Sequence, residues 1–188
     1  MASSASASWI AIRPSPEVIR AARVDLVWLS PEVLEGLRAG RVAEIAGAAV
    51  PAAWVTRAAR LFELRLQQLE REPQRAPWLV RAIVERDRRA IVGHVSFHGP
   101  PGSNALGAVD ALEIGFTIEP AYRRRGFARE AALALMAWAK GLGIHRFLAS
   151  VSPTNTASLA LVRGLGFVEA TMVEDEEDGP EIVFERRV

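Results

Sequence analysis

Cysteine is missing from this chain of 188 residues, and so is any long apolar run. Without cysteine there are no disulfide bonds, thiol nucleophiles or thiolate metal sites. No segment approaches the roughly 18 to 20 apolar residues that span a bilayer. Residues 1–8 are rich in alanine and serine but lack the basic start and apolar core of a signal peptide. We therefore expect no membrane partner, a cytoplasmic location, and a disordered tail over residues 1–8.

Strong charge of either sign is also missing, since the formal net charge is +1. A nucleic-acid partner is not expected, because such proteins carry a pronounced basic surface. The charges that are present gather in an acidic run at residues 174–178 and a basic cluster at 123–125. The acidic run suits a solvated hairpin tip, or a surface that attracts cationic acceptors.

Histidine is scarce as well, with three in the chain. If residues 90–97 form a strand, the α-carbons of His94 and His98 lie about 13 Å apart at roughly 3.3 Å per residue. That distance is too long for the two imidazoles to chelate one small ion, so we expect no metal. His98 could instead line a substrate pocket.

The elements that are present predict a mixed α/β protein. No repeat or low-complexity linker divides residues 9–188, which are therefore expected to form one domain. Residues 112–118 alternate between apolar and polar or small side chains, as a half-buried strand does. Residues 128–140 are rich in alanine and leucine and predict a helix. The stretch that joins this strand to this helix is the most informative part of the chain.

The connection between Ile118 and the helix has the features of an anion site. The first amides of a helix lack intrahelical acceptors and lie at the positive end of its dipole, which favours phosphate binding. Gly126 lets a phosphate approach the backbone closely, Ala128 keeps the next position small, and Arg123 to Arg125 add positive charge. By themselves these residues fit an ordinary turn with solvated arginines equally well. The Walker and dinucleotide-binding glycine motifs are absent.

A family resemblance favours the anion site. The spacing Arg123-x-x-Gly126-x-Ala128 resembles the coenzyme A signature of GNAT acetyltransferases. The preceding strand 112–118, the Val151-Ser-Pro-x-Asn155 stretch and the Leu165-Gly-Phe sequence resemble the ribosomal-protein N-terminal acetyltransferase branch. The resemblance covers about residues 90–170 and keeps the family's order of motifs.

The resemblance implies a fold and a cofactor. The fold is a single mixed, mostly antiparallel twisted sheet flanked by helices, with about six or seven strands and four helices. The co-substrate is acetyl-CoA, whose pantetheine arm would pair with the strand as an added strand does. The residues that would bind it are Phe116, Thr117, Ile118, Arg123, Arg124, Arg125, Gly126, Phe127, Ala128, Arg129 and Asn155.

Two side chains are candidates for catalysis under the resemblance. Glu113 matches a glutamate of the branch and would remove the proton of the acceptor ammonium, directly or through a water; the alternative is that it is simply a polar residue of an alternating strand. The usual acid is a tyrosine, but Val162 stands at that position and Tyr122 is the only tyrosine. Ser158 could donate a proton instead, or merely satisfy helix amides, and the thiolate could also leave unaided.

These features predict an enzyme that transfers an acetyl group to a primary amine. The acceptor is either a protein N-terminus or a small amine, and the protein is a monomer or a homodimer. One alternative is a non-catalytic acyl-CoA sensor or interaction module, which the valine at position 162 favours. Another is a nucleotide-binding protein that uses the same turn, although the chain has no motif for a base or a metal.

Overall fold

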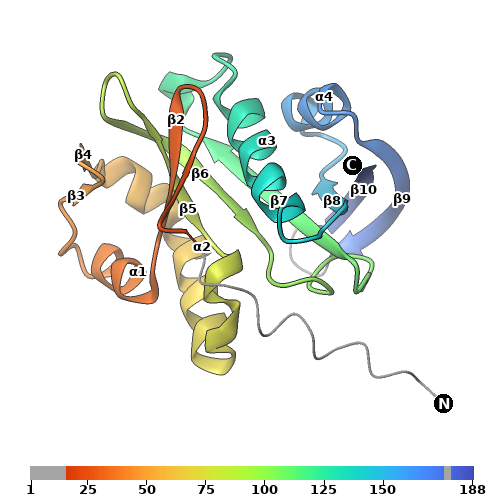
Figure 1. Ribbon diagram of the computed structural model, residues 1–188, viewed down its shortest axis with the longest axis horizontal. Coiled ribbons are helices and arrows are strands. Elements are labelled where there is room, and N and C mark those ends of the chain that lie inside the picture. The colour runs from red at the N-terminus through yellow and green to blue at the C-terminus, as the bar shows by residue number, and fades with distance from the viewer. Residues whose placement is uncertain (1–15, 176–178) are drawn as a thin grey trace. The chain divides into compact units, whose positions relative to one another are not determined.

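The computed structural model describes residues 16–175 and 179–188, which contain four α-helices and ten strands (Figure 1). The expected mixed α/β class and the number of α-helices are confirmed, but six or seven strands was too low. Three strands of two or three residues account for the difference: β1 (Val18–Arg20), β3 (Glu44–Ile45) and β4 (Ala48–Ala49). Such short strands cannot display the two-residue alternation on which a prediction depends.

The described residues form two compact units, each with its own core. The N-terminal unit consists of residues 16–96 and 116–135, and the described part of the C-terminal unit comes from residues 97–115 and 136–188. Strand β7 (Ala111–Ile118) and helix α3 (Phe127–Lys140) run from one unit into the other. The single domain expected over residues 9–188 stays a prediction, and the expected tail at residues 1–8 lies outside the described residues.

Four antiparallel strands organise the N-terminal unit. Strand β2 (Val24–Trp28) pairs with β1 on one side and with β5 (Arg81–Glu85) on the other, and β5 pairs with β6 (Ala90–Phe97). The tiny β3–β4 hairpin joins β6 through a parallel contact.

Two helices supply much of the N-terminal core. Helix α1 (Pro31–Arg38) begins with the Ser30 side chain accepting from the Val33 amide, and proline occupies its first position. Helix α2 (Ala52–Arg71) is followed by the 3-10 turn η2 (Pro73–Trp78). The buried side chains of α2 recur at helical spacing and pack into the core cluster: Trp54, Ala58, Phe62, Leu66 and Leu69.

Strand order β7-β8-β10-β9 organises the C-terminal unit. Strand β8 (Arg146–Val151) is parallel to β7, while β10 (Gly179–Arg187) pairs antiparallel with β8 and with β9 (Val168–Asp175). The parallel ladder ends at Glu113, opposite Leu148; the later residues of β8 pair only with β10. Strand β7 thus continues beyond Glu113 without pairing to β8. The predicted hairpin tip at 174–178 lies partly outside the described residues.

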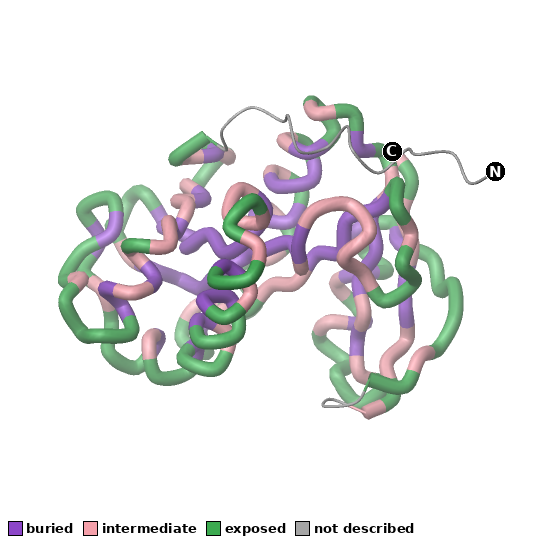
Figure 2. Tube along the Cα trace, turned by 90° about the horizontal axis from the view of Figure 1, so that it is seen from below, coloured by how far each residue is buried: buried purple, intermediate pink, exposed green. Residues whose placement is uncertain are grey.

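Ring stacking holds one part of the C-terminal core. Phe97 stacks on Trp138 and on Phe147, with ring centroids 6.4 and 6.2 Å apart. Helix α4 (Thr156–Gly164) contributes buried Leu159 and Val162. The buried residues of each unit are purple in Figure 2, and many connecting loops are green. No helix in the described ranges is both long and apolar enough to cross a membrane.

Candidate active site

The turn after β7 has a specific backbone conformation. The 3-10 turn η3 (Pro120–Tyr122) leads into four exposed residues, 123–126, and α3 begins at Phe127. Arg124 and Gly126 have φ angles of 61° and 82°. Glycine adopts this left-handed region without steric cost, whereas arginine does so only rarely. The expected start of the helix near Gly126 or Ala128 is confirmed to within a residue, and the expected cofactor turn is an exposed loop at a helix N-terminus.

Contacts from both sides hold this turn in place. The Arg123 Nε donates to the Ile118 carbonyl at 3.0 Å, which ties the turn to the end of β7. The Arg125 guanidinium lies 5.7 Å from the centre of the Tyr122 ring. Gly93, on β6, lets the end of β7 approach, because a Cβ there would lie 2.0 Å from the Thr117 carbonyl oxygen.

Arg23 is a further support of the turn that sequence reasoning missed. Its Nη1 donates to the Arg125 carbonyl at 3.1 Å, and its guanidinium carbon lies 4.9 Å from the centre of the Phe127 ring. Its Nε pairs with Glu130 at 2.8 Å. Arg23 is about one hundred residues away in sequence and carries no motif of its own, so only the fold reveals it.

Two carboxylates near the turn are neutralised by arginines. Burial alone would raise the pKa of Glu130, but hydrogen bonds from Arg23 and Val24 outweigh it and leave the pKa below its ordinary value. Glu119 is buried directly before η3 and pairs with Arg57 of α2, whose pKa the bond raises. Because both carboxylates already have cationic partners, they oppose an anionic ligand at the turn less than bare charges would.

Glu113 lies at the centre of a polar cluster in the C-terminal unit. The residue is 1% exposed, and its carboxylate accepts from the Ser150 hydroxyl at 2.5 Å and from the Ala105 amide at 2.6 Å. The His98 Nδ1 lies 3.7 Å from Oε1 of the same carboxylate. A buried carboxylate requires such donors, because burying it unpaired costs several kcal/mol. Glu113 is thus a buried carboxylate that is hydrogen-bonded within the protein, and its catalytic role stays a prediction.

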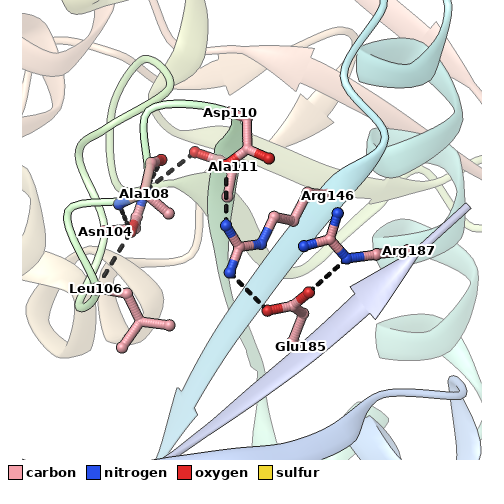
Figure 3. Close-up of polar contacts among 8 residues, drawn as sticks. All are labelled: Asn104, Leu106, Ala108, Asp110, Ala111, Arg146, Glu185 and Arg187. Carbon is pink, nitrogen blue, oxygen red and sulfur yellow. Dashed lines mark hydrogen bonds and ion pairs between the residues drawn. The ribbon is translucent and has the colours of Figure 1, made fainter.

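The loop before β7 positions the Ala105 amide that donates to Glu113. The side chain of Asn104 donates to the carbonyls of Ala108 and Ala111 at 2.8 and 3.0 Å, and its oxygen accepts from the amides of Leu106 and Ala108 (Figure 3). One amide side chain thus closes the loop on itself and on the start of β7.

An arginine network braces the strand ends beside this loop. Arg146 pairs with Asp110 at 2.9 Å and with Glu185 at 2.7 Å, and Arg187 donates to the same glutamate (Figure 3). These contacts join the end of the loop to β8 and β10. They lower the pKa of Glu185 and raise that of Arg146, chiefly through the hydrogen bond that joins the two side chains.

The predicted residues of α4 lie at its first turn. Asn155 is the N-cap, and its Oδ1 accepts from the Ser158 amide at 3.1 Å. Neither the Asn155 Nδ2 nor the Ser158 hydroxyl has a hydrogen-bond partner among the described residues, so both remain able to bind a ligand. Val162 is fully buried, and its apolar side chain has no proton to donate.

The predicted site residues therefore divide between the two units. Phe116 to Ile118 and Arg123 to Arg129 belong to the N-terminal unit, while Glu113, Asn155 and Ser158 belong to the C-terminal unit. Sequence reasoning missed Ala105 and Ser150, the donors to Glu113. For Ser150 a weak signal existed, because alternation along β8 places it on the same face as Leu148; Ala105 acts through its backbone and left no signal. No group of three or more His, Cys, Asp or Glu in the described ranges could hold a metal ion.

Comparisons with known proteins define the class. A family model described as "Acetyltransferase (GNAT) domain" matches residues 23–168, so the chain belongs to the GNAT acetyltransferase family. It is 29% identical over 85 residues to YnaD, an uncharacterized N-acetyltransferase of Bacillus subtilis (strain 168), covering 45% of this chain and 46% of YnaD. The chain spans about half the length of the curated relatives it matches.

Solved structures share the fold over nearly the whole chain. RimL, a ribosomal L7/L12 alpha-N-protein acetyltransferase, superposes with a TM-score of 0.62 at 17% identity, over 92% of this chain and 98% of RimL. The microcin C7 self-immunity acetyltransferase MccE, solved with acetyl-CoA and AMP, gives a TM-score of 0.59 at 17% identity, over 88% of this chain and 93% of MccE. At this level of identity the likeness establishes the fold alone.

Proposed function

We propose that this protein transfers the acetyl group of acetyl-CoA to a primary amine by direct attack in a ternary complex. The observation that carries the proposal is the turn at residues 123–126, an exposed, cationic loop at the start of α3 in which Arg124 and Gly126 have left-handed φ angles. The family match supports coenzyme A as the ligand of this turn, because the pyrophosphate of coenzyme A is anionic and the turn is cationic.

The turn would hold the pyrophosphate. The amides of Phe127 and Ala128 belong to the first turn of α3 and would donate to an anion in the manner of other helix N-termini. A Cβ on Gly126 would find only the Arg23 guanidinium within 4 Å, at 3.3 Å, so the backbone there is open to a ligand. Arg123 to Arg125 and Arg129 supply full positive charges.

Strand β7 would hold the pantetheine arm. Its ladder with β8 ends at Glu113, so the later backbone groups, Phe116 to Ile118, are available to an extended ligand that pairs as a strand does. One of these amides would face the thioester oxygen and stabilise the developing oxyanion. Asn155 of the C-terminal unit is proposed, from the family resemblance alone, to donate to coenzyme A through its Nδ2.

Glu113 would support the removal of the ammonium proton. Because the residue is 1% exposed and both its oxygens already accept hydrogen bonds, the ammonium proton would be taken up by an intermediate group that Glu113 supports, not by direct contact with the carboxylate. Ser158 would donate to the departing thiolate through its hydroxyl. Val162 has no such proton, so Ser158 is the candidate acid on α4.

The acceptor is an amine on a peptide or on a small molecule. RimL is described as acting on the alpha-amino group of a ribosomal protein, and YnaD as an N-acetyltransferase. Both descriptions support an amine acceptor. The exposed His98 imidazole beside Glu113 supports an acceptor pocket on that face of β7. The protein would work as a monomer or a homodimer, without nucleic acid.

Thiol release from acetyl-CoA tests the proposal. Purified protein is assayed with a panel of peptides and small amines, alongside Glu113→Gln and the matched control Glu169→Gln, which removes an exposed glutamate of β9. We expect release with at least one acceptor, a loss of about 10²- to 10⁴-fold in Glu113→Gln, and little change in the control. Coenzyme A binding should persist in both variants.

Each other outcome has a definite reading. If turnover persists in Glu113→Gln, the assignment of the protein as an enzyme stands and Glu113 has no part in the mechanism. Tight acetyl-CoA binding without release across the panel favours the sensor or interaction module, as the buried valine at position 162 would then suggest. Absence of any acetyl-CoA binding contradicts the assignment of the turn.

A further inference from the structure

We infer that His98 is the catalytic residue that accepts the proton of the acceptor ammonium, with Glu113 as the positioning residue that holds and stabilises its imidazole. The inference rests on the proposed function and names the group that stands between the buried carboxylate and the amine.

Exposure separates the two side chains. The His98 side chain is 42% exposed and that of Glu113 only 2% exposed, although Nδ1 and Oε1 lie 3.7 Å apart. An acceptor amine can therefore reach the imidazole but not the carboxylate. A modest closure on substrate binding would bring Nδ1 and Oε1 into hydrogen-bond distance, as is common for catalytic contacts that are long without ligand.

The backbone fixes this pair in place. The His98 amide donates to the Glu113 carbonyl at 2.9 Å, so the two residues face each other across neighbouring strands. The preceding residue, Phe97, stacks on the rings of Trp138 and Phe147. Because both anchors belong to the C-terminal unit, the imidazole is supported at the carboxylate by residues that do not depend on the turn.

The Glu113 carboxylate has hydrogen-bond donors that carry no positive charge. Ser150 and Ala105 donate hydrogen bonds to Glu113 but bring no positive charge. Among residues 16–175 and 179–188, His98 is the only ionisable side chain within ion-pair distance of this carboxylate. A buried carboxylate stabilises an imidazolium beside it, so Glu113 favours proton uptake by His98 from the amine.

The other two histidines do not fit this role. His94 is buried, burial lowers its pKa to about 4, and its Nδ1 accepts from the Trp54 indole. Its ring is therefore neutral near neutral pH. The His145 Nδ1 lies 2.8 Å from the Val188 carbonyl oxygen, with no carboxylate partner among the described residues. Imidazole is otherwise the side chain best suited to proton transfer near neutral pH.

The proton steps balance. The ammonium of the acceptor gives one proton to the His98 Nε2, and the Nδ1–H faces Glu113. The neutral amine nitrogen then bonds to the thioester carbonyl carbon, and the carbon–sulfur bond breaks. Ser158 gives its hydroxyl proton to the sulfur, which leaves as the thiol, and takes up the second proton of the attacking nitrogen. The exposed imidazolium releases its proton to water, so each turnover gives amide, coenzyme A thiol and one proton.

Substitution with chemical rescue tests the inference. The full chain is assayed by thiol release with the most active amine of the panel, as wild type, His98→Gln, His98→Ala and the control His145→Gln. We expect His98→Gln to lower kcat by about 10²-fold or more, while the acetyl-CoA dissociation constant and Tm stay near those of wild type. Imidazole added to His98→Ala should restore turnover in proportion to its concentration, and the control should match wild type.

Three results would overturn the inference. Turnover of His98→Gln within a few-fold of wild type removes His98 from the proton path, and the enzyme assignment survives. A loss in His98→Ala that imidazole does not rescue assigns the residue a structural role. A wild type that binds acetyl-CoA but acetylates no amine defeats the proposed function, and this inference falls with it.

Discussion

The turn at residues 123–126 and the Glu113 cluster are built in opposite ways. The turn is exposed, and most of its residues are neighbours in sequence: a strand end, a glycine, three arginines and a helix start. The cluster surrounds one buried carboxylate, that of Glu113, and its other members are His98, Ala105 and Ser150, which lie on a strand end, a loop and a strand.

This difference explains why the turn could be predicted from the sequence and the partners of Glu113 could not. A helix N-terminus binds anions through backbone groups that every sequence carries, so the spacing of one glycine and one arginine, taken with the family resemblance, was enough to predict it. A buried carboxylate needs partners from several segments, and one partner here is a backbone amide that any residue could supply. The same contrast separates Arg23 from the arginines of the turn.

The largest predicted effect is a loss of stability at low pH that comes from His94. His94 is a buried ionisable residue of the N-terminal unit, as Glu113 is of the C-terminal unit. Burial lowers the pKa of His94 from 6.5 to about 4. Between pH 6.5 and pH 4 the unfolded chain therefore binds more protons than the folded chain. The contribution of neutral His94 to the free energy of unfolding is fully present above pH 6.5 and falls as the pH drops toward 4. We expect about 3 kcal/mol of the free energy of unfolding to be lost across this window.

Denaturant titration from pH 7.5 to 4 measures this loss in wild type and in His94→Gln, whose amide oxygen can still accept from Trp54. The difference between the two curves isolates the histidine from the carboxylates that titrate in both. Parallel curves would show that His94 is protonated at no cost in the folded state.

The second effect tests how strongly the loop supports the cluster. Asn104→Ala removes the side chain that closes residues 104–111 and takes away one of the two hydrogen-bond donors to each of the Ala108 and Ala111 carbonyls. We expect a loss of about 2 kcal/mol of stability and reduced turnover, because the Ala105 amide is no longer held at Glu113. Denaturation and thiol release measure the two losses; coenzyme A affinity should not change, and a drop in affinity would contradict the separation of the regions.

The third effect tests the turn by itself. Gly126→Ala places a Cβ in the left-handed region and 3.3 Å from the Arg23 guanidinium, and we expect the dissociation constant of coenzyme A to rise about tenfold, or 1.4 kcal/mol. Gly143→Ala is the matched control, with a φ of 90° and nothing within 4 Å of its Cβ. Both variants carry left-handed strain of roughly 1–2 kcal/mol, so equal loss of affinity, measured by calorimetry, would rule out a specific role for the turn.

The smallest effect concerns Ser158. Its amide is capped by Asn155, which stays in place in Ser158→Ala, so the stability should change by less than about 0.5 kcal/mol. If the hydroxyl protonates the thiolate, kcat falls while the affinity for acetyl-CoA holds. Unchanged kcat would mean that the thiolate leaves unaided.

The sequence by itself determined the local parts of this protein. Alternation at residues 112–118 predicted β7, residue propensity predicted α3, and glycine with arginines marked the turn between strand and helix, because each depends on neighbours along the chain. The family resemblance then pointed to Glu113. Strands of two or three residues escaped prediction, since they carry no periodic signal.

The folded structure was needed to show which residues, distant in sequence, contact the turn at residues 123–126 and the Glu113 carboxylate. It placed Arg23 beneath the turn, closed the Asn104 loop so that Ala105 donates to Glu113, and set an exposed His98 beside that buried carboxylate. These relations depend on strand register and loop closure, which bring together residues that the linear order keeps apart. Burial and ionic pairing are properties of the packed chain, whereas the start of a helix and the buried face of a strand depend on short runs of residues.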